Sequence, residues 1–201
     1  MTPAIIWSVA LGILAVATFA AWIVRRECGI GQVGERVLLY MAGALCVLGI
    51  ALIIGAGPFH AAAIAALAIL CAAIVETDAR LNLIPDTLVA PLFVIALVMP
   101  NALPLADKVV SALLLGLLFL AVRQGYEFWR KQEGLGLGDV KLAMAMGAVL
   151  GAERALIAVA AAAVITAGYV LWRMPKDDGA PFGVGLASAT AAAALVGAAL
   201  A

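Results

Sequence analysis

Two aspartates, Asp78 and Asp139, stand in the segments of this sequence that are best suited to chemistry. Asp78 lies in the polar segment 76–86, and Asp139 follows a glycine-rich run that ends in Gly136-Leu137-Gly138. Two carboxylates that share one site cannot both ionise easily, so one keeps a proton while the other acts as a base. Such a pair can activate a water molecule and protonate a substrate carbonyl, which is the chemistry of aspartic proteases. The sequence therefore predicts that the two aspartates form a catalytic pair.

Each aspartate taken alone has a simpler explanation. Asp139 stands where the N-cap of a helix belongs, and Asp78 suits an ordinary solvated loop charge between the third and fourth apolar stretches. An ionisable residue near membrane depth is costly, however, and such a residue is a functional hypothesis by default. The hypothesis therefore rests on the two residues together.

The composition indicates that lipid is the solvent for much of the protein surface. Of the 201 residues, 67% are hydrophobic and only 12% are charged, whereas about 25% are charged in ordinary soluble domains. The 12 basic and 12 acidic residues balance, so nothing indicates a nucleic-acid partner. Three separate cysteines and one histidine favour neither a disulfide framework nor a metal centre. We expect no metal and no cofactor.

The elements that must position the pair are apolar stretches with the length of membrane helices. A spanning helix needs about 20 apolar residues, and we expect an all-α polytopic membrane protein with about eight transmembrane helices, the first retained rather than removed as a signal peptide. We divide the chain into two N-terminal helices with a short loop (1–58) and a six-helix core (59–201). The apolar stretches cover residues 4–24, 37–56, 60–75, 86–100, 107–123, 140–151, 154–172 and 182–200.

The basic residues orient these helices, because cytoplasmic loops carry the excess of Lys and Arg. If the helices alternate in direction, ten basic residues fall on one face and only Lys108 and Arg154 fall on the other. The face with ten also holds both aspartates, so we expect the pair on the cytoplasmic side of the membrane. The stretches 86–100 and 140–151 are short for a hydrocarbon core of about 30 Å. Their shortness predicts a wet notch, in which polar segments dip below the membrane surface.

Further residues near the pair are candidates for supporting or substrate-binding roles. Asp86 follows Pro85 and suits a helix cap better than catalysis, whereas Arg80 suits either a membrane anchor or a contact with the substrate. Glycine lets a backbone approach closely, and proline fixes a bend. The candidates are Glu76, Arg80, Asp86, Gly136, Gly138, Lys141, Pro181 and Gly183.

Three motifs, TDARLNLIPD, GLGLGDVKLAMAMGAVLG and APFGVGLASA, occur in an order that resembles the bacterial type IV prepilin peptidases. These enzymes belong to the GxGD aspartic membrane proteases, and the likeness covers roughly residues 60–201. In that family one catalytic aspartate lies seven residues before the proline of the (L/I)PD segment, as Asp78 does, and the other closes GxGD, as Asp139 does.

The resemblance implies a GxGD aspartic protease fold and a defined substrate. The enzyme would be a multi-pass protein of the bacterial inner (plasma) membrane and would cleave the short basic leader from type IV prepilins or pseudopilins at its cytoplasmic face. The substrate's apolar helix would lie in the membrane lipid, and the pilus or secretion assembly machinery would be a further partner.

The loop after the first expected helix departs from the pattern of the longer family members. Longer members carry a cytoplasmic insertion with paired CxxC motifs and also methylate the new N-terminus, whereas the loop 25–36 is short and holds Cys28 alone. We therefore expect a peptidase without methyl transfer from S-adenosylmethionine. Two alternatives stay open: a GxGD peptidase for another membrane substrate, and a non-enzymatic subunit that carries ions or protons. A transporter should show helices broken in corresponding halves, and the sequence shows no such symmetry.

Overall fold

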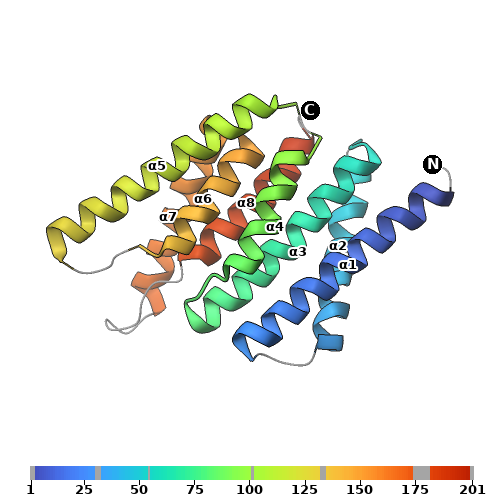
Figure 1. The fold of residues 1–201 in the computed structure, drawn as a ribbon, viewed down its shortest axis with the longest axis horizontal. Helices are drawn as coiled ribbons and strands as arrows, with labels where there is room; N and C mark the ends of the chain where they lie inside the picture. Colours follow the sequence, from blue (N-terminus) through green and yellow to red (C-terminus); the bar gives the residue numbers. More distant parts are fainter. Residues whose placement is uncertain are drawn as a thin grey trace.

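Eight helices form the described part of the chain, which in this computed structural model comprises residues 3–29, 33–53, 55–100, 102–131, 135–173 and 182–199. Four of them, over residues 6–27, 35–53, 58–81 and 105–130, are long and apolar enough to cross a membrane. The expected all-α class is confirmed, and these spans favour an integral membrane protein. The helices (Figure 1) are α1 (Pro3–Cys28), α2 (Val33–Ile53), α3 (Pro58–Leu81), α4 (Asp86–Val98), α5 (Leu105–Arg130), α6 (Leu137–Leu150), α7 (Ala152–Arg173) and α8 (Phe182–Ala199).

Helix α3 continues beyond residue 75, where the apolar stretch ends. Glu76 and Arg80 stand four residues apart, with 3.5 Å between their charged groups, and such a pair supports a helix. The helix ends at Asn82, which adopts the left-handed conformation (φ 49°) and donates its backbone N–H to the carbonyl of Asp78. Asn tolerates this conformation better than most residues. The segment that holds Asp78 is therefore the last part of a helix, and the expected loop position was wrong.

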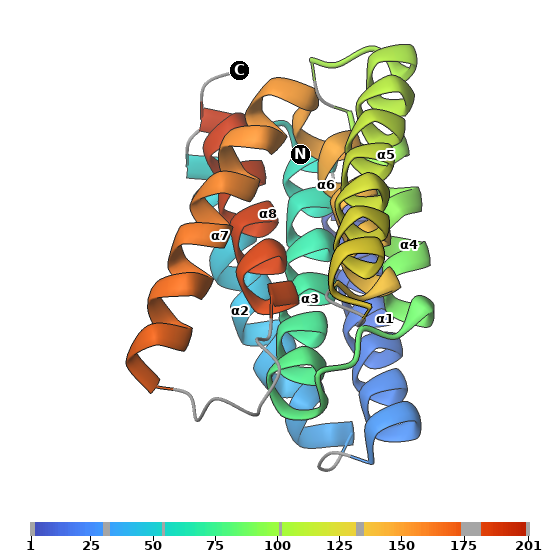
Figure 2. The ribbon, with the colours of Figure 1, turned by 90° about the vertical axis from the view of Figure 1, so that its left-hand side faces the viewer.

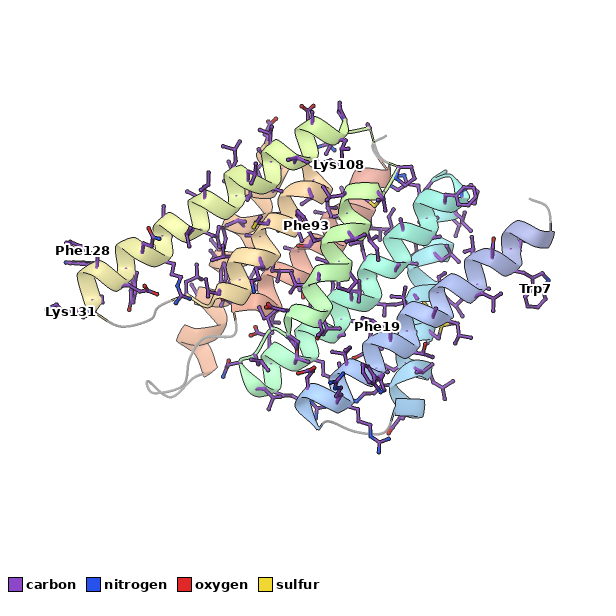
Figure 3. The ribbon with its side chains drawn as sticks, in the orientation of Figure 1. Trp7, Phe19, Phe93, Lys108, Phe128 and Lys131 are labelled. Carbon is purple, nitrogen blue, oxygen red and sulfur yellow. The ribbon has the colours of Figure 1, made fainter. Side chains whose placement is uncertain are left out.

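Helix α5 also runs past its expected end at residue 123. Arg123 and Glu127 form an ion pair of 2.8 Å one turn apart, and the helix stops only at Lys131, which is left-handed (φ 54°). Its 26 residues rise about 39 Å, at about 1.5 Å per residue. The last turns therefore extend beyond a hydrocarbon core of about 30 Å. Figure 3 shows Phe128 and Lys131 at this projecting end.

The bundle has two central helices, α3 and α6. Helix α3 packs against α1, α2, α4 and α8, while α6 packs against α4, α5, α7 and α8. As far as the described helices go, α3 and α6 make no close backbone approach to each other. Helices α4 and α8 each pack against both α3 and α6, and Figures 1 and 2 show the bundle from two sides. The relative position of any side chains on α3 and α6 thus depends on these two intervening helices.

Small residues allow the close packing of α6. Ala143, Ala145 and Ala148 have no exposed surface. A Cβ atom on Gly147 would lie 2.6 Å from the backbone oxygen of Ser111 in α5. Glycine and alanine let membrane helices approach closely, so α5 and α6 form a tight pair.

Lys108 closes the end of α4 that lies far from Asp86. Its side chain is only 3% exposed, and its Nζ donates to the carbonyls of Ala96, Leu97 and Met99 at 3.3, 3.1 and 2.5 Å. The last carbonyls of a helix have no partners within that helix, and a cation stabilises this end. Lys108 is thus a structural residue (Figure 3).

Three further charged residues gather at this same end, among them Arg154, the other basic residue expected on the outer face. Asp107, Glu153 and Arg154 line a cavity of about 440 Å³, together with His60 near the start of α3. His60 precedes Asp78 by 18 residues of helix, which corresponds to roughly 27 Å. This arrangement agrees with the expected separation of the two faces. The side of the membrane that each face meets stays a prediction.

Candidate active site

Asp78 is a buried helical residue, not a solvated loop charge. Its side chain is 5% exposed, and its Oδ2 accepts the backbone N–H of Val184 at 2.9 Å. Gly183 also donates a backbone hydrogen bond to this carboxylate. The first N–H groups of a helix have no partners within the helix and bind anions. The start of α8 therefore holds the Asp78 carboxylate.

Gly183 permits this contact because it lacks a side chain. A Cβ atom at this position would lie 2.9 Å from Oδ2 of Asp78 and 2.6 Å from Cδ1 of Ile84. The backbone at residue 183 thus packs directly against the carboxylate of Asp78. Pro181, its companion in the same motif, lies outside the described residues.

Asp139 is the third residue of α6, and the N-cap residue of this helix is Gly136. The expected N-cap position was therefore wrong by three residues, because the glycine run itself opens the helix. The carboxylate of Asp139 reaches back to the backbone N–H of Gly136, as the third residue does in a capping box. Its Oδ1 is buried and has no hydrogen-bond partner in the part of the chain that the structure describes.

The structure brings Asp78 and Asp139 close enough for their charges to interact. The two residues come from α3 and α6, whose described backbones make no close approach to each other. One aspartate is held by the start of α8 and the other by the turn that opens α6. The arrangement provides two neighbouring carboxylates, and one oxygen of Asp139 accepts no hydrogen bond from the described residues.

Asp86 and Lys141 form an ion pair beside this site. Lys141 Nζ contacts both carboxylate oxygens of Asp86 at 2.6 Å, which connects α4 to α6. The cap of α4 is Pro85 and not Asp86, so the expected capping role was wrong. An exposed pair of this kind contributes little stability. An apolar groove of about 290 Å³ adjoins the pair and is lined by Val89, Ala90, Phe93 and Met144.

Glu76 faces helix α2. It forms an ion pair with Arg36 and accepts a hydrogen bond of 2.9 Å from the hydroxyl of Tyr40. Residues 76 and 78 are two positions apart, which puts them on opposite sides of a helix with 3.6 residues per turn. Glu76, which also pairs with Arg80 of its own helix, therefore connects α3 to α2 instead of joining the aspartate pair.

Arg123 holds the segment that leads into α6. Its Nη1 donates to the carbonyl of Leu135 at 2.7 Å, and its side chain is only 13% exposed. Nothing in the sequence distinguishes Arg123 from the other basic residues of the face that holds the aspartates. Leu135 directly precedes the Gly136 turn, so Arg123 fixes one end of the backbone that carries Asp139.

We expect Arg123→Ala to lower the catalytic rate about tenfold. The lost hydrogen bond involves a charged donor, and such bonds contribute about 1.5–3 kcal/mol, enough for a tenfold change in rate. The measurement is the initial rate of leader cleavage by the purified protein. Arg130→Ala is the matched control, since it removes the same charge from the exposed end of α5. Equal rates in the two variants would contradict the role of Arg123.

A sequence model of the type IV leader peptidase family matches residues 65–171. No curated protein and no solved structure matches the chain. The matched range covers somewhat more than half of the 201 residues and includes Asp78, Gly136, Gly138 and Asp139. The predicted family resemblance is confirmed by this match, and the chain belongs to the type IV leader peptidase family.

Proposed function

We propose that this protein is a membrane-embedded aspartic endopeptidase that removes the basic leader from type IV prepilins or pseudopilins at the cytoplasmic membrane face. One observation carries the proposal: the charges of Asp78 and Asp139 interact, although the backbones of α3 and α6 make no close approach. The Oδ1 of Asp139 is buried and has no hydrogen-bond partner among the described residues. The family is one of proteases, which favours a peptidase over a subunit that carries ions. An ionisable pair inside a membrane protein is also a functional hypothesis on physical grounds.

The mechanism uses the two aspartates as a unit that shares one proton. The ionised carboxylate takes a proton from a water molecule, and the water oxygen attacks the scissile carbonyl carbon. The protonated carboxyl donates its proton to the carbonyl oxygen, which gives a neutral diol. As the diol collapses, the carboxyl group that took the proton from water gives it to the leaving nitrogen, the other carboxylate takes a proton from a diol hydroxyl, and the C–N bond breaks. Two carboxyl groups suffice for these transfers, and no protein nucleophile is needed.

Substrate access follows from the position of the pair near the ends of its helices. Asp78 lies four residues before the C-cap of α3, and Asp139 lies in the first turn of α6. A charged leader could reach this end from water while the apolar helix of the substrate stays in lipid. The exposed pair of Asp86 and Lys141 and the apolar groove beside it adjoin the same end, where both parts of such a substrate meet.

The test is cleavage of a prepilin-like protein by the purified chain in detergent. We expect a single cut after the basic leader, which a gel shift and mass spectrometry of the product detect. A signal-peptide remnant serves as the rival substrate. Cleavage of the remnant alone would favour the other membrane peptidase function, and cleavage of neither would contradict a peptidase role.

Chelators are expected to leave this activity unchanged. In the described residues, no group of three or more His, Cys, Asp or Glu side chains is placed to hold a metal ion, and the proposed steps need only carboxyl groups. Initial rates with and without EDTA provide the measurement. Inhibition by EDTA that added zinc reverses would contradict the two-aspartate mechanism.

A further inference from the structure

Ile84 lies in the short connection between α3 and α4, close to both aspartates in space. Asn82 ends α3 in the left-handed conformation and is bonded to the carbonyl of Asp78 at 2.9 Å. The chain then passes through Leu83 and Ile84 to Pro85, the N-cap of α4. Pro85 restricts the backbone of the residue before it. The position of Ile84 is therefore fixed from both sides.

The side chain of Ile84 fills the space between the two glycines that adjoin the aspartates. A Cβ atom on Gly138, the residue before Asp139, would lie 2.8 Å from Cβ of Ile84. A Cβ atom on Gly183, which donates to Asp78, would lie 2.6 Å from Cδ1 of Ile84. Ile84 thus lies against the start of α6, nearest through its Cβ, and against the start of α8 through its Cδ1.

This position matters because α3 and α6 make no close backbone approach within the helices described. The distance between the carboxylates is therefore set by what lies between the starts of α6 and α8 and the end of α3. We propose that Ile84 is a positioning residue that sets the separation of Asp78 and Asp139. The proposal rests on the proposed peptidase function, and it adds the residue that holds the pair at working distance.

The first test compares Ile84→Ala with Ile95→Ala. Ile95 is also half-buried, lies in α4 and packs against the same core, so its replacement removes the same atoms from a site without contact to either glycine. We expect Ile84→Ala to lower kcat at least about tenfold with little change in KM, since misplacement by about 1 Å can cost a hundredfold. Ile95→Ala should keep kcat near that of the unmodified protein.

The dependence of kcat on pH separates positioning from general destabilisation. A changed distance alters the repulsion between the two carboxylates, so the width of the bell-shaped profile should change in Ile84→Ala. It should stay the same in Ile95→Ala. Ile84→Val, which keeps Cβ and loses only Cδ1, should fall between the unmodified protein and Ile84→Ala. It serves as the deciding variant if Ile84→Ala does not fold.

A double variant tests the contact with Gly138 directly. Gly138→Ala should lose activity because its new methyl group meets Cβ of Ile84. Adding Ile84→Gly removes that Cβ, so the double variant should lose less than the product of the two single losses. Adding Ile84→Ala instead keeps Cβ and should give no relief.

A distance measurement keeps this test independent of catalysis. Spin labels are attached to cysteines introduced at positions 80 and 137, both exposed near the ends of α3 and α6, in a protein whose native cysteines have been replaced. They report the separation of the two helices. Ile84→Ala should broaden the distance distribution, and Ile95→Ala should not. Equal kcat, pH profile and distance distribution in these two variants would overturn the role of Ile84. Absence of cleavage in the unmodified protein, with a distance that still depends on Ile84, would instead contradict the peptidase function.

Discussion

Asp78→Asn and Asp139→Asn are each expected to lower leader cleavage by at least about a hundredfold, because general acid–base catalysis contributes about 10²–10⁴-fold. An amide has nearly the shape of a carboxyl group, but it neither takes a proton from water nor donates one to the carbonyl oxygen. Each variant should stay folded in the membrane fraction. The measurement is the initial rate of prepilin cleavage in detergent, with the amount of protein equalised.

Asp107→Asn is the control for this experiment. Asp107 is exposed and lies in the first turn of α5, where it lines the cavity at the end of the bundle away from the pair. The same chemical change there should leave the rate unaltered. Full activity in either Asp78→Asn or Asp139→Asn would remove the basis of the aspartic mechanism.

The approximate positions of the helices could be predicted from the sequence, because long apolar runs are required for helices in lipid. Several helix ends could not. Apolar runs end at the first charged residues, whereas a helix continues through them where side chains pair one turn apart. Glu76 with Arg80 extends α3 in this way, and Arg123 with Glu127 extends α5.

The residues of the pair could be proposed from their motifs, but the groups that hold them could not. Val184 is 106 positions from Asp78 in the chain, and its N–H meets Oδ2 only because α8 packs against α3. Ile84 stood inside a motif, yet it is an apolar residue with no chemistry to draw attention to it. Its contacts depend on the approach of α6 and α8, which no local pattern encodes. The same holds for Lys141, which pairs with Asp86 across 55 positions.

Gly183→Ala should lower kcat by about one to two orders of magnitude, which makes it the most damaging change outside the aspartates. The new methyl group would lie 2.9 Å from Oδ2 of Asp78 and 2.6 Å from Cδ1 of Ile84, both closer than ordinary contact distance. Either the start of α8 moves away and its N–H groups lose the carboxylate, or Asp78 and Ile84 move. Both responses displace a reacting group, and displacement by about 1 Å can cost a hundredfold in rate.

Gly168→Ala supplies the comparison that isolates this contact. Gly168 lies in α7, the helix before α8, and a Cβ atom there would meet nothing within 4 Å. Alanine favours a helix over glycine by about 1 kcal/mol, so this variant should be slightly more stable and equally active. Rates are measured at saturating substrate, because the clash acts on the carboxylate and leaves substrate binding intact. If Gly183→Ala matched Gly168→Ala in kcat, the start of α8 would not be what holds Asp78 in its working position.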